Sequence, residues 1–251
     1  GTNGFGIYLN NGVGEFTVQP RVAVGVEAVD LQLGDFNQDG ALDFIFLQDT
    51  GNLGVCLGQG DGTFQAPRNT SVSSGSARIA VGDVDGDSFP DLAIVNKDEE
   101  STQILIGAGD GSFTLSQNFD EQMEAYDVAL ADLDGDGKND LVVSLFSRAR
   151  VRLGTGTGTF VEPSDYPLGL GGQRLHLADL NGDTLPDLAV LNFVQNAVSV
   201  LSGRADGTFD DRIDFAVKST TADVASGDID SDGAQDLILV SFVSFELLFA
   251  R

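Results

Sequence analysis

The sequence contains no tryptophan and only one cysteine, one histidine and one methionine among its 251 residues. The single cysteine, Cys56, excludes a disulfide within the chain, and its apolar neighbours indicate a small core residue. The single histidine, His176, excludes a histidine-rich zinc site, and we interpret it as a packing or hydrogen-bonding residue. No apolar run reaches the roughly 20 residues of a membrane-spanning helix, so we expect no membrane insertion.

Basic residues are scarce as well, since 13 Lys and Arg stand against 39 Asp and Glu, for a formal net charge of −26. So acidic a surface repels phosphate groups, which argues against nucleic acid as a partner. The 41% apolar content argues against a disordered acidic tail. We therefore expect a folded chain in which many carboxylates lie near cations.

The sequence is rich in one repeated pattern. An Asp-rich motif occurs five times, and successive copies begin 48, 49, 47 and 49 positions apart. A glycine-rich motif that ends in Phe also occurs five times, in register with the first. The Asp-rich motifs begin at Asp35, Asp83, Asp132, Asp179 and Asp228, and the glycine-rich motifs end at Phe16, Phe64, Phe113, Phe160 and Phe209.

Each repeat contains four short runs typical of strands, the first before the Asp-rich motif and the second directly after it. No stretch shows a sustained 3.6-residue period, so helices are not expected. Four-stranded antiparallel units at this period predict an all-β fold, namely a β-propeller of four-stranded blades.

We expect one propeller domain over residues 1–251, built from five repeats. The chain begins with the third and fourth strands of a repeat and ends with the first three. Residues 1–20 would therefore supply closing outer strands to a five-bladed ring, although one third strand is then duplicated. A fragment of a six- or seven-bladed ring is the alternative.

The Asp-rich motifs place carboxylate or amide side chains at positions 1, 3, 5 and 9. Such a set of hard oxygen ligands, without His or Cys, favours Ca²⁺ over zinc or copper. Position 7 varies freely, as expected if only its backbone carbonyl binds the ion; these residues are Ala41, Phe89, Lys138, Leu185 and Ala234. The side-chain ligands are Asp35, Asn37, Asp39 and Asp43; Asp83, Asp85, Asp87 and Asp91; Asp132, Asp134, Asp136 and Asp140; Asp179, Asn181, Asp183 and Asp187; and Asp228, Asp230, Asp232 and Asp236.

An EF-hand also begins D-x-D-x-D, but it requires a Glu at position 12 and a helix on each side. Position 12 is apolar in all five motifs, and the residues around it are typical of a strand. The sequence therefore predicts strand–loop–strand calcium sites, about five in number. We interpret the ions as structural rather than as signals, because such loops lack a helix pair that could open.

The D-x-[DN]-x-D-x-x-x-D loop, followed by an apolar strand and G-x-G-D-G-[ST]-F, resembles the FG-GAP/VCBS repeats. These repeats occur in bacterial surface proteins, some fungal lectins and the integrin α-chain propeller. The resemblance implies calcium loops on one face, between the first and second strands of each blade. It also implies a secreted or cell-surface location, with which loops suited to millimolar calcium agree. No signal peptide is visible in the sequence.

A ligand surface could lie on the opposite face, where two sets of residues are candidates. Five positions before each motif stands a charged residue, and this collar would either form Asp–Arg pairs between blades or bind a polar ligand. The connecting segments differ between repeats, as recognition surfaces do on rigid scaffolds. The collar is Asp30, Arg78, Asp127, Arg174 and Asp223, and the connecting segments add Tyr126, Tyr166, Arg148 and Arg150.

Three functions remain open at this point. The first is a non-enzymatic extracellular module for adhesion, carbohydrate binding or protein binding. The second is a carbohydrate-active enzyme, a glycosidase or lyase. It would use Asp30, Asp127 and Asp223 of the collar, at the mouth of the channel in the centre of the propeller. The third is a purely structural domain of a larger surface protein.

Overall fold

The computed structural model describes residues 4–25, 27–48, 50–217, 221–241 and 245–248. Within these ranges the regular structure consists of β-strands, which confirms the predicted all-β class. No helix in the described ranges has the length and apolar character needed to span a membrane.

Four complete sheets repeat the same order, in which four consecutive strands pair antiparallel with their neighbours. We call them blades 1 to 4. Blade 1 comprises β5 (Ala28–Gly34), β6 (Asp43–Gln48), β7 (Asn52–Cys56) and β8 (Arg68–Ser71). Blade 2 comprises β9 (Ser76–Gly82), β10 (Asp91–Asn96), β11 (Ser101–Gly107) and β12 (Phe113–Asp120). Blade 3 comprises β13 (Ala125–Ala131), β14 (Asp140–Leu145), β15 (Arg148–Arg152) and β16 (Ser164–Pro167), and blade 4 comprises β17 (Gly172–Ala178), β18 (Asp187–Asn192), β19 (Ala197–Leu201) and β20 (Ile213–Ala216).

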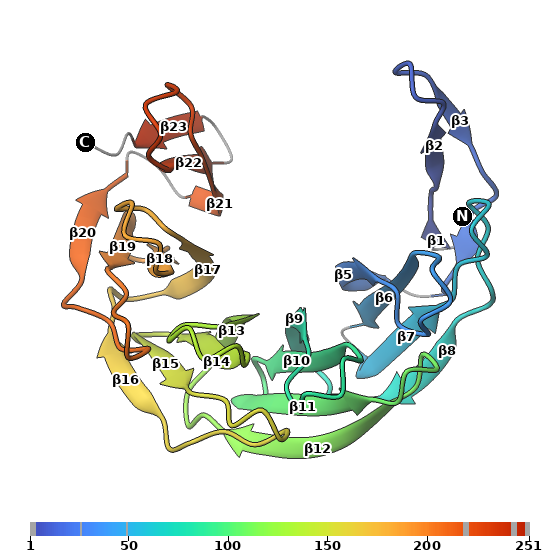
Figure 1. Ribbon diagram of the computed structural model, residues 1–251, viewed down its shortest axis with the longest axis horizontal. Helices are drawn as coiled ribbons and strands as arrows, with labels where there is room; N and C mark the ends of the chain where they lie inside the picture. The colour runs from blue at the N-terminus through green and yellow to red at the C-terminus, as the bar shows by residue number, and fades with distance from the viewer. Residues whose placement is uncertain (1–3, 26, 49, 218–220, 242–244, 249–251) are drawn as a thin grey trace.

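The two ends of the chain hold smaller sheets. Blade 5 has three strands, β21 (Thr221–Gly227), β22 (Asp236–Ser241) and β23 (Phe245–Leu248). At the N-terminal end, β2 (Tyr8–Asn10) pairs with β3 (Phe16–Val18), and β1 (Gly4–Phe5) pairs with β4 (Val22–Ala23). Figure 1 shows the blades following one another along an open arc, with these two end regions on either side of the opening.

The ring closure predicted for residues 1–20 is not present among the described residues. There β2 pairs only with β3, and β23 pairs only with β22. The reason is the duplicated third strand, because β23 already occupies the third place in blade 5 while β2 and β3 form a hairpin of their own. The structure thus confirms propeller blades of four antiparallel strands, and the five-bladed closed ring stays a prediction.

The core lies between successive blades, because the second strand of each complete blade is buried on both faces. Alternate side chains of a strand point to opposite faces, so each second strand supplies two interfaces. In β10, Leu92 and Ile94 pack toward blade 1, whereas Ala93 and Val95 pack toward blade 3. The buried Cys56 belongs to the core, as predicted.

The first strands show where this packing ends. Ile79 and Val128 are buried against the preceding blade, but the equivalent Leu31 is 38% exposed and Leu33 is 60% exposed. Apolar residues alternate along all these strands, a pattern typical of one buried face. Leu31 and Leu33 differ because, among the described residues, the segment before blade 1 forms two two-stranded sheets rather than a complete blade.

Candidate metal-binding loops and ligand surfaces

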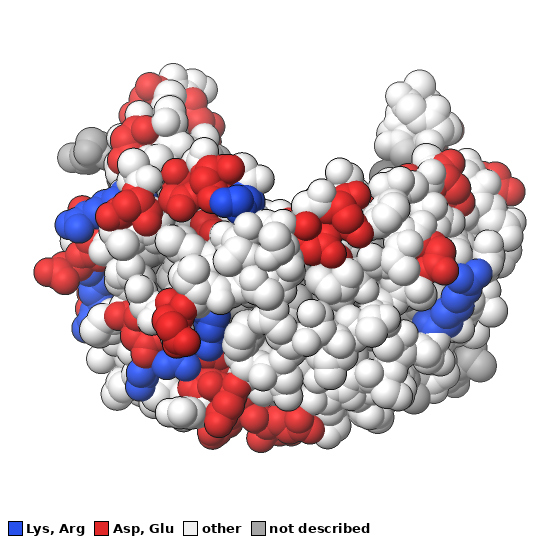
Figure 2. Space-filling model, turned by 60° about the horizontal axis from the view of Figure 1, so that its bottom comes forward, with Lys and Arg blue, Asp and Glu red and all other residues white. Residues whose placement is uncertain are grey.

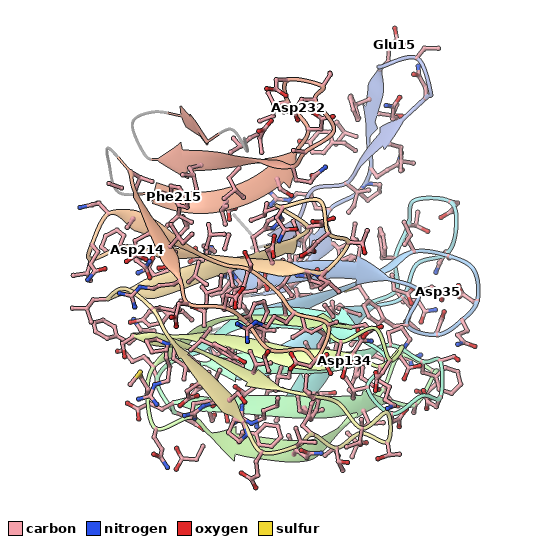
Figure 3. The ribbon with its side chains drawn as sticks, turned by 60° about the vertical axis from the view of Figure 1, so that its left-hand side comes forward. Glu15, Asp35, Asp134, Asp214, Phe215 and Asp232 are labelled. Atoms are coloured by element: carbon pink, nitrogen blue, oxygen red, sulfur yellow. The ribbon has the colours of Figure 1, made fainter. Side chains whose placement is uncertain are left out.

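Each Asp-rich motif forms the loop between the first and second strands of its blade, as predicted. Figure 3 shows Asp35, Asp134 and Asp232 on loops at the same side of the arc, away from Phe215 on β20. Positions 4 and 6 of every loop have positive φ angles, which glycine adopts without strain. At least one of the two is a glycine in each loop, and these pairs are Gln38 and Gly40, Gly86 and Ser88, Gly135 and Gly137, Gly182 and Thr184, and Ser231 and Gly233.

The first Asp of each loop shapes the turn around its own carboxylate. In blade 2, Asp83 Oδ1 accepts a hydrogen bond from the Gly86 amide at 2.7 Å, and Oδ2 accepts one from the Ser88 amide at 2.8 Å. Short side chains of this type favour such local turns. The hydrogen bonds curl the loop so that the side chains at positions 1, 3 and 5 come together.

The ninth residue of each loop is a buried anchor as well as a candidate ligand. Asp91 is fully buried, and its two oxygens accept the amides of Val84 and Gly107 at 2.8 Å each. Burial raises the pKa of Asp91 to about 6. Asp43, Asp140 and Asp187 make the same two bonds in blades 1, 3 and 4.

Sequence reasoning did not identify this anchoring role, although a signal for it was present. The third strand of each complete blade is followed or ended by a glycine, such as Gly58 or Gly107. A Cβ at Gly107 would lie 2.2 Å from the Pro90 carbonyl oxygen, so only glycine lets the third strand approach the loop. The repeated glycine therefore marks the place where the anchor carboxylate binds the next strand.

The carboxylates converge in three of the loops. One ligand atom from each member of a triplet lies within 4.8 Å of the others, and these triplets are Asp83, Asp85 and Asp91; Asp132, Asp134 and Asp136; and Asp228, Asp230 and Asp236. The remaining two loops carry an amide, Asn37 or Asn181, at position 3. Asn181 Nδ2 donates to Asp187 Oδ1 at 3.3 Å.

The electrostatics of these triplets suit an added cation. Burial and then the charges of Asp87 and Asp83 raise the pKa of Asp85. Partial desolvation and then the charges of Asp232, Asp236 and Asp228 raise the pKa of Asp230. Lys138 Nζ lies 2.5 Å from Asp136 Oδ2 and partly offsets the negative charge of that loop. Several carboxylate oxygens with like charge at short distance fit a hard divalent ion such as Ca²⁺. The position-7 carbonyls stay predicted ligands.

The collar residues lie at the joints between blades. Asp30 Oδ2 accepts the amide of Ile79 in the next blade at 2.8 Å, and Asp127 Oδ2 accepts the amide of Leu175 at 3.0 Å. Asp127 is 9% exposed, and burial raises its pKa to about 6.

The other collar residues also contact groups across a joint. Arg174 Nε lies 3.9 Å from Asp223 Oδ1, and Arg78 Nη1 donates to the Val29 carbonyl at 3.3 Å. These contacts favour the interpretation of the collar as inter-blade pairing. His176, whose Nε2 lies 2.9 Å from Ser226 Oγ, likewise bonds to the neighbouring blade, and burial lowers its pKa.

The connecting-segment candidates divide into two groups. Tyr126 is half-buried, with its hydroxyl bonded to Glu124 and Lys97 Nζ 5.0 Å from its ring centre. Tyr166 packs edge-on against Phe209, with ring centres 5.5 Å apart. These contacts hold both tyrosines in place.

The candidate arginines belong to an ion-pair network at the joint between blades 2 and 3. Its centre is Glu121, which is 1% exposed and which sequence reasoning did not single out. Arg152 and Arg150 each contact Glu121, at 3.0 and 3.1 Å, and Thr102 Oγ1 donates to it at 2.7 Å. Asp165 pairs with Arg150 and Arg148, at 2.6 Å each, and these guanidinium groups hold the pKa of Asp165 at about 2.

A signal for Glu121 was present in the alignment of the repeats. It stands eight positions after the repeated Phe, where the other four copies have aliphatic residues in apolar clusters. Those residues are Val24, Val72, Leu168 and Val217. A single acidic residue at an otherwise aliphatic position indicates a local change of the core.

Comparison with known proteins supports the repeat and the fold. A family model described as FG-GAP-like repeat matches residues 35–94, 83–143, 132–190 and 179–239. A search of curated proteins gave no match to the chain.

Several solved structures resemble the whole chain. One is a lectin from Agrocybe aegerita, described as recognising non-reducing terminal N-acetylglucosamine, with a TM-score of 0.72 and 20% identity over 100% of this chain and 72% of the lectin chain. Another is BBS1N in complex with ARL6DN, with a TM-score of 0.66 and 12% identity over 99% of this chain and 72% of that chain. A protein from Lactobacillus plantarum has a TM-score of 0.62 and 13% identity over 96% of this chain and 76% of its own. At these identities the likeness concerns the fold.

Proposed function

Given that the chain belongs to the FG-GAP-like repeat family, we propose that it is a calcium-stabilised extracellular binding module rather than an enzyme. The observation that carries the proposal is the convergence of carboxylates in the Asp-rich loops, since in three of them one oxygen from each of three carboxylates lies within 4.8 Å of the others. Such loops require an external cation, and the extracellular space supplies calcium at millimolar concentration.

The position of the loops supports a structural role for the ion. The second loop residue of blade 1, Phe36, accepts a hydrogen bond from the Gly111 amide of blade 2 at 2.9 Å. Val84 of blade 2 accepts one from Gly158 of blade 3, also at 2.9 Å. An ion that orders a loop would therefore also order its joint with the next blade.

Thermal unfolding with calcium and with excess EGTA tests the calcium part of the proposal. Binding to the native state alone stabilises it by about 2.7 kcal/mol per site when the free ion is at 100 times Kd. We expect a lower Tm in EGTA, restored by calcium but not by an equal concentration of Na⁺. An unchanged Tm would remove calcium from the proposal.

The binding part of the proposal concerns a glycan. Two observations support it: the lectin resembles the whole chain in fold, and the collar carboxylates Asp30 and Asp127 are engaged in bonds between blades rather than free for catalysis. A glycan displayed on another cell would make this module an adhesion domain. A glycan array probed with the protein in calcium tests it, and an array without reproducible signals would contradict it.

A further inference from the structure

A hollow with a volume of about 350 Å³ lies at the joint between blades 2 and 3. Small-molecule sites in proteins begin at about this size. Both blades contribute to its walls, with Phe119 and Gln122 on one side and Arg150, Arg152, Phe160 and Val161 on the other. The hollow thus depends on the two blades being held in a fixed relation.

Its apolar wall is built from two phenylalanines. The rings of Phe119 and Phe160 meet edge-on, with centres 6.1 Å apart. The guanidinium of Arg152 lies over the Phe119 ring, 4.4 Å from its centre. These contacts fix an aromatic surface beside a row of N–H donors.

Its polar wall is charged but internally neutralised. Glu121 accepts from both Arg150 and Arg152, and Asp165 accepts two further bonds from Arg150. The side chains of Arg150 and Arg152 are 12% and 5% exposed, so their positions are determined by these bonds. The carboxylates of Asp120 and Glu162 also line the hollow and would repel an acidic ligand.

Stability does not explain why this joint is polar. The equivalent joint before blade 1 has a smaller hollow, of about 280 Å³, lined by residues that include Val22, Phe64 and Gln65. Gly54 and Cys56 stand there in place of the two arginines of blade 3. A buried ion pair is often no more stabilising than the apolar residues that it replaces.

Figure 2 shows that acidic side chains outnumber basic ones on the displayed face, so a cluster of arginines is unusual in this chain.

We propose that the hollow between blades 2 and 3 binds a neutral sugar, and this inference rests on the glycan-binding function proposed above. The apolar C–H face of a pyranose ring would lie against Phe119 and Phe160. The hydroxyl groups would bond to the guanidinium groups of Arg150 and Arg152 and to the Gln122 amide. A neutral ligand fits because the guanidinium charges are already balanced, and acidic sugars are disfavoured by Asp120 and Glu162.

The test compares two matched substitutions in the calcium-loaded protein. Val161 and Gln65 both follow the repeated Phe directly, and both are exposed. V161R would fill the proposed site, whereas Q65R would place the same side chain in the hollow before blade 1. The binding of the strongest neutral oligosaccharide from the array is then measured by calorimetry.

We expect V161R to weaken this binding at least tenfold and Q65R to change it less than twofold. A second variant, Q122A, removes one polar contact at an exposed residue and should weaken binding about threefold to tenfold. Equal affinities in wild type, V161R and Q122A, at an unchanged calcium-dependent Tm, would overturn the site while leaving the glycan-binding function intact. An array with no glycan signals of any kind would overturn both, and signals confined to acidic glycans would overturn the ligand class while leaving the glycan-binding function intact.

Discussion

The Asp-rich loops and the joint between blades 2 and 3 place charge in opposite ways. The Asp-rich motif recurs in five repeats, and in three of its loops carboxylates of like charge converge. The joint pairs Glu121 and Asp165 with three arginines, and only one of the five repeats has an acidic residue eight positions after the repeated Phe. Unbalanced charge calls for an ion from solution, whereas balanced charge fixes side chains for other contacts. The repeated feature therefore suits the scaffold, and the single feature suits recognition.

The strongest test separates the two roles of the loop carboxylates. Asp91→Ala should destabilise the protein by about 3–5 kcal/mol, with or without calcium, because it removes two buried hydrogen bonds along with a ligand. Asp85→Asn should destabilise it only in calcium, because Asp85 contributes a ligand but no buried anchor. Urea unfolding in calcium and in EGTA measures both, and equal losses for D85N under the two conditions would contradict the distinction.

The joint between blades 2 and 3 can be converted to the composition of the other repeats. Glu121→Val alone leaves Arg152 buried without its partner and should cost about 3–5 kcal/mol. The double variant E121V/R152L restores residues of the kind found in the other copies, and its stability should return to within about 1 kcal/mol of wild type. Urea unfolding checks the stability, and loss of glycan binding by a stable double variant would sharpen the assignment of the site.

Asp127, which lies outside the Asp-rich loops and the hollow, should make the stability of the protein depend on pH. Its pKa is raised by burial to about 6 in the folded protein, from 3.8. The folded state therefore binds more protons than the unfolded state between these values, and stability falls as pH rises through this window, by up to about 3 kcal/mol. Asp127→Asn should flatten this part of the curve, measured in EGTA so that calcium binding does not vary with pH. An unchanged slope in D127N would contradict the assignment.

The smallest effect is expected from the loop backbone. Thr184 occupies a loop position with a φ of 73°, where a β-branched residue is strained. Thr184→Gly should raise stability by about 0.5–1 kcal/mol, and Gly182→Ala in the same loop should lower it by a similar amount. Thermal unfolding at saturating calcium measures both, and a destabilised T184G would show that the strain is compensated elsewhere.

Some features were available from the sequence because they depend on local chemistry repeated five times. The spacing of the loops, the strand on each side and the oxygen ligands follow from turn and strand preferences over a few residues. The burial of Cys56 and the hydrogen bond of His176 also agree with the predictions.

Other features depend on which blades meet, which no single repeat records. The sequence indicates that Asp91 is a ligand, but only the packed blade shows that both of its oxygens also hold the backbone. The sequence shows Glu121, Arg150 and Arg152 as separate charges, 29 and 31 positions apart, and only the joint brings them within hydrogen-bond distance. Local patterns determined the repeat because neighbouring residues encode it, whereas tertiary structure decided the ion-pair network and the open arc because contacts between blades join distant segments.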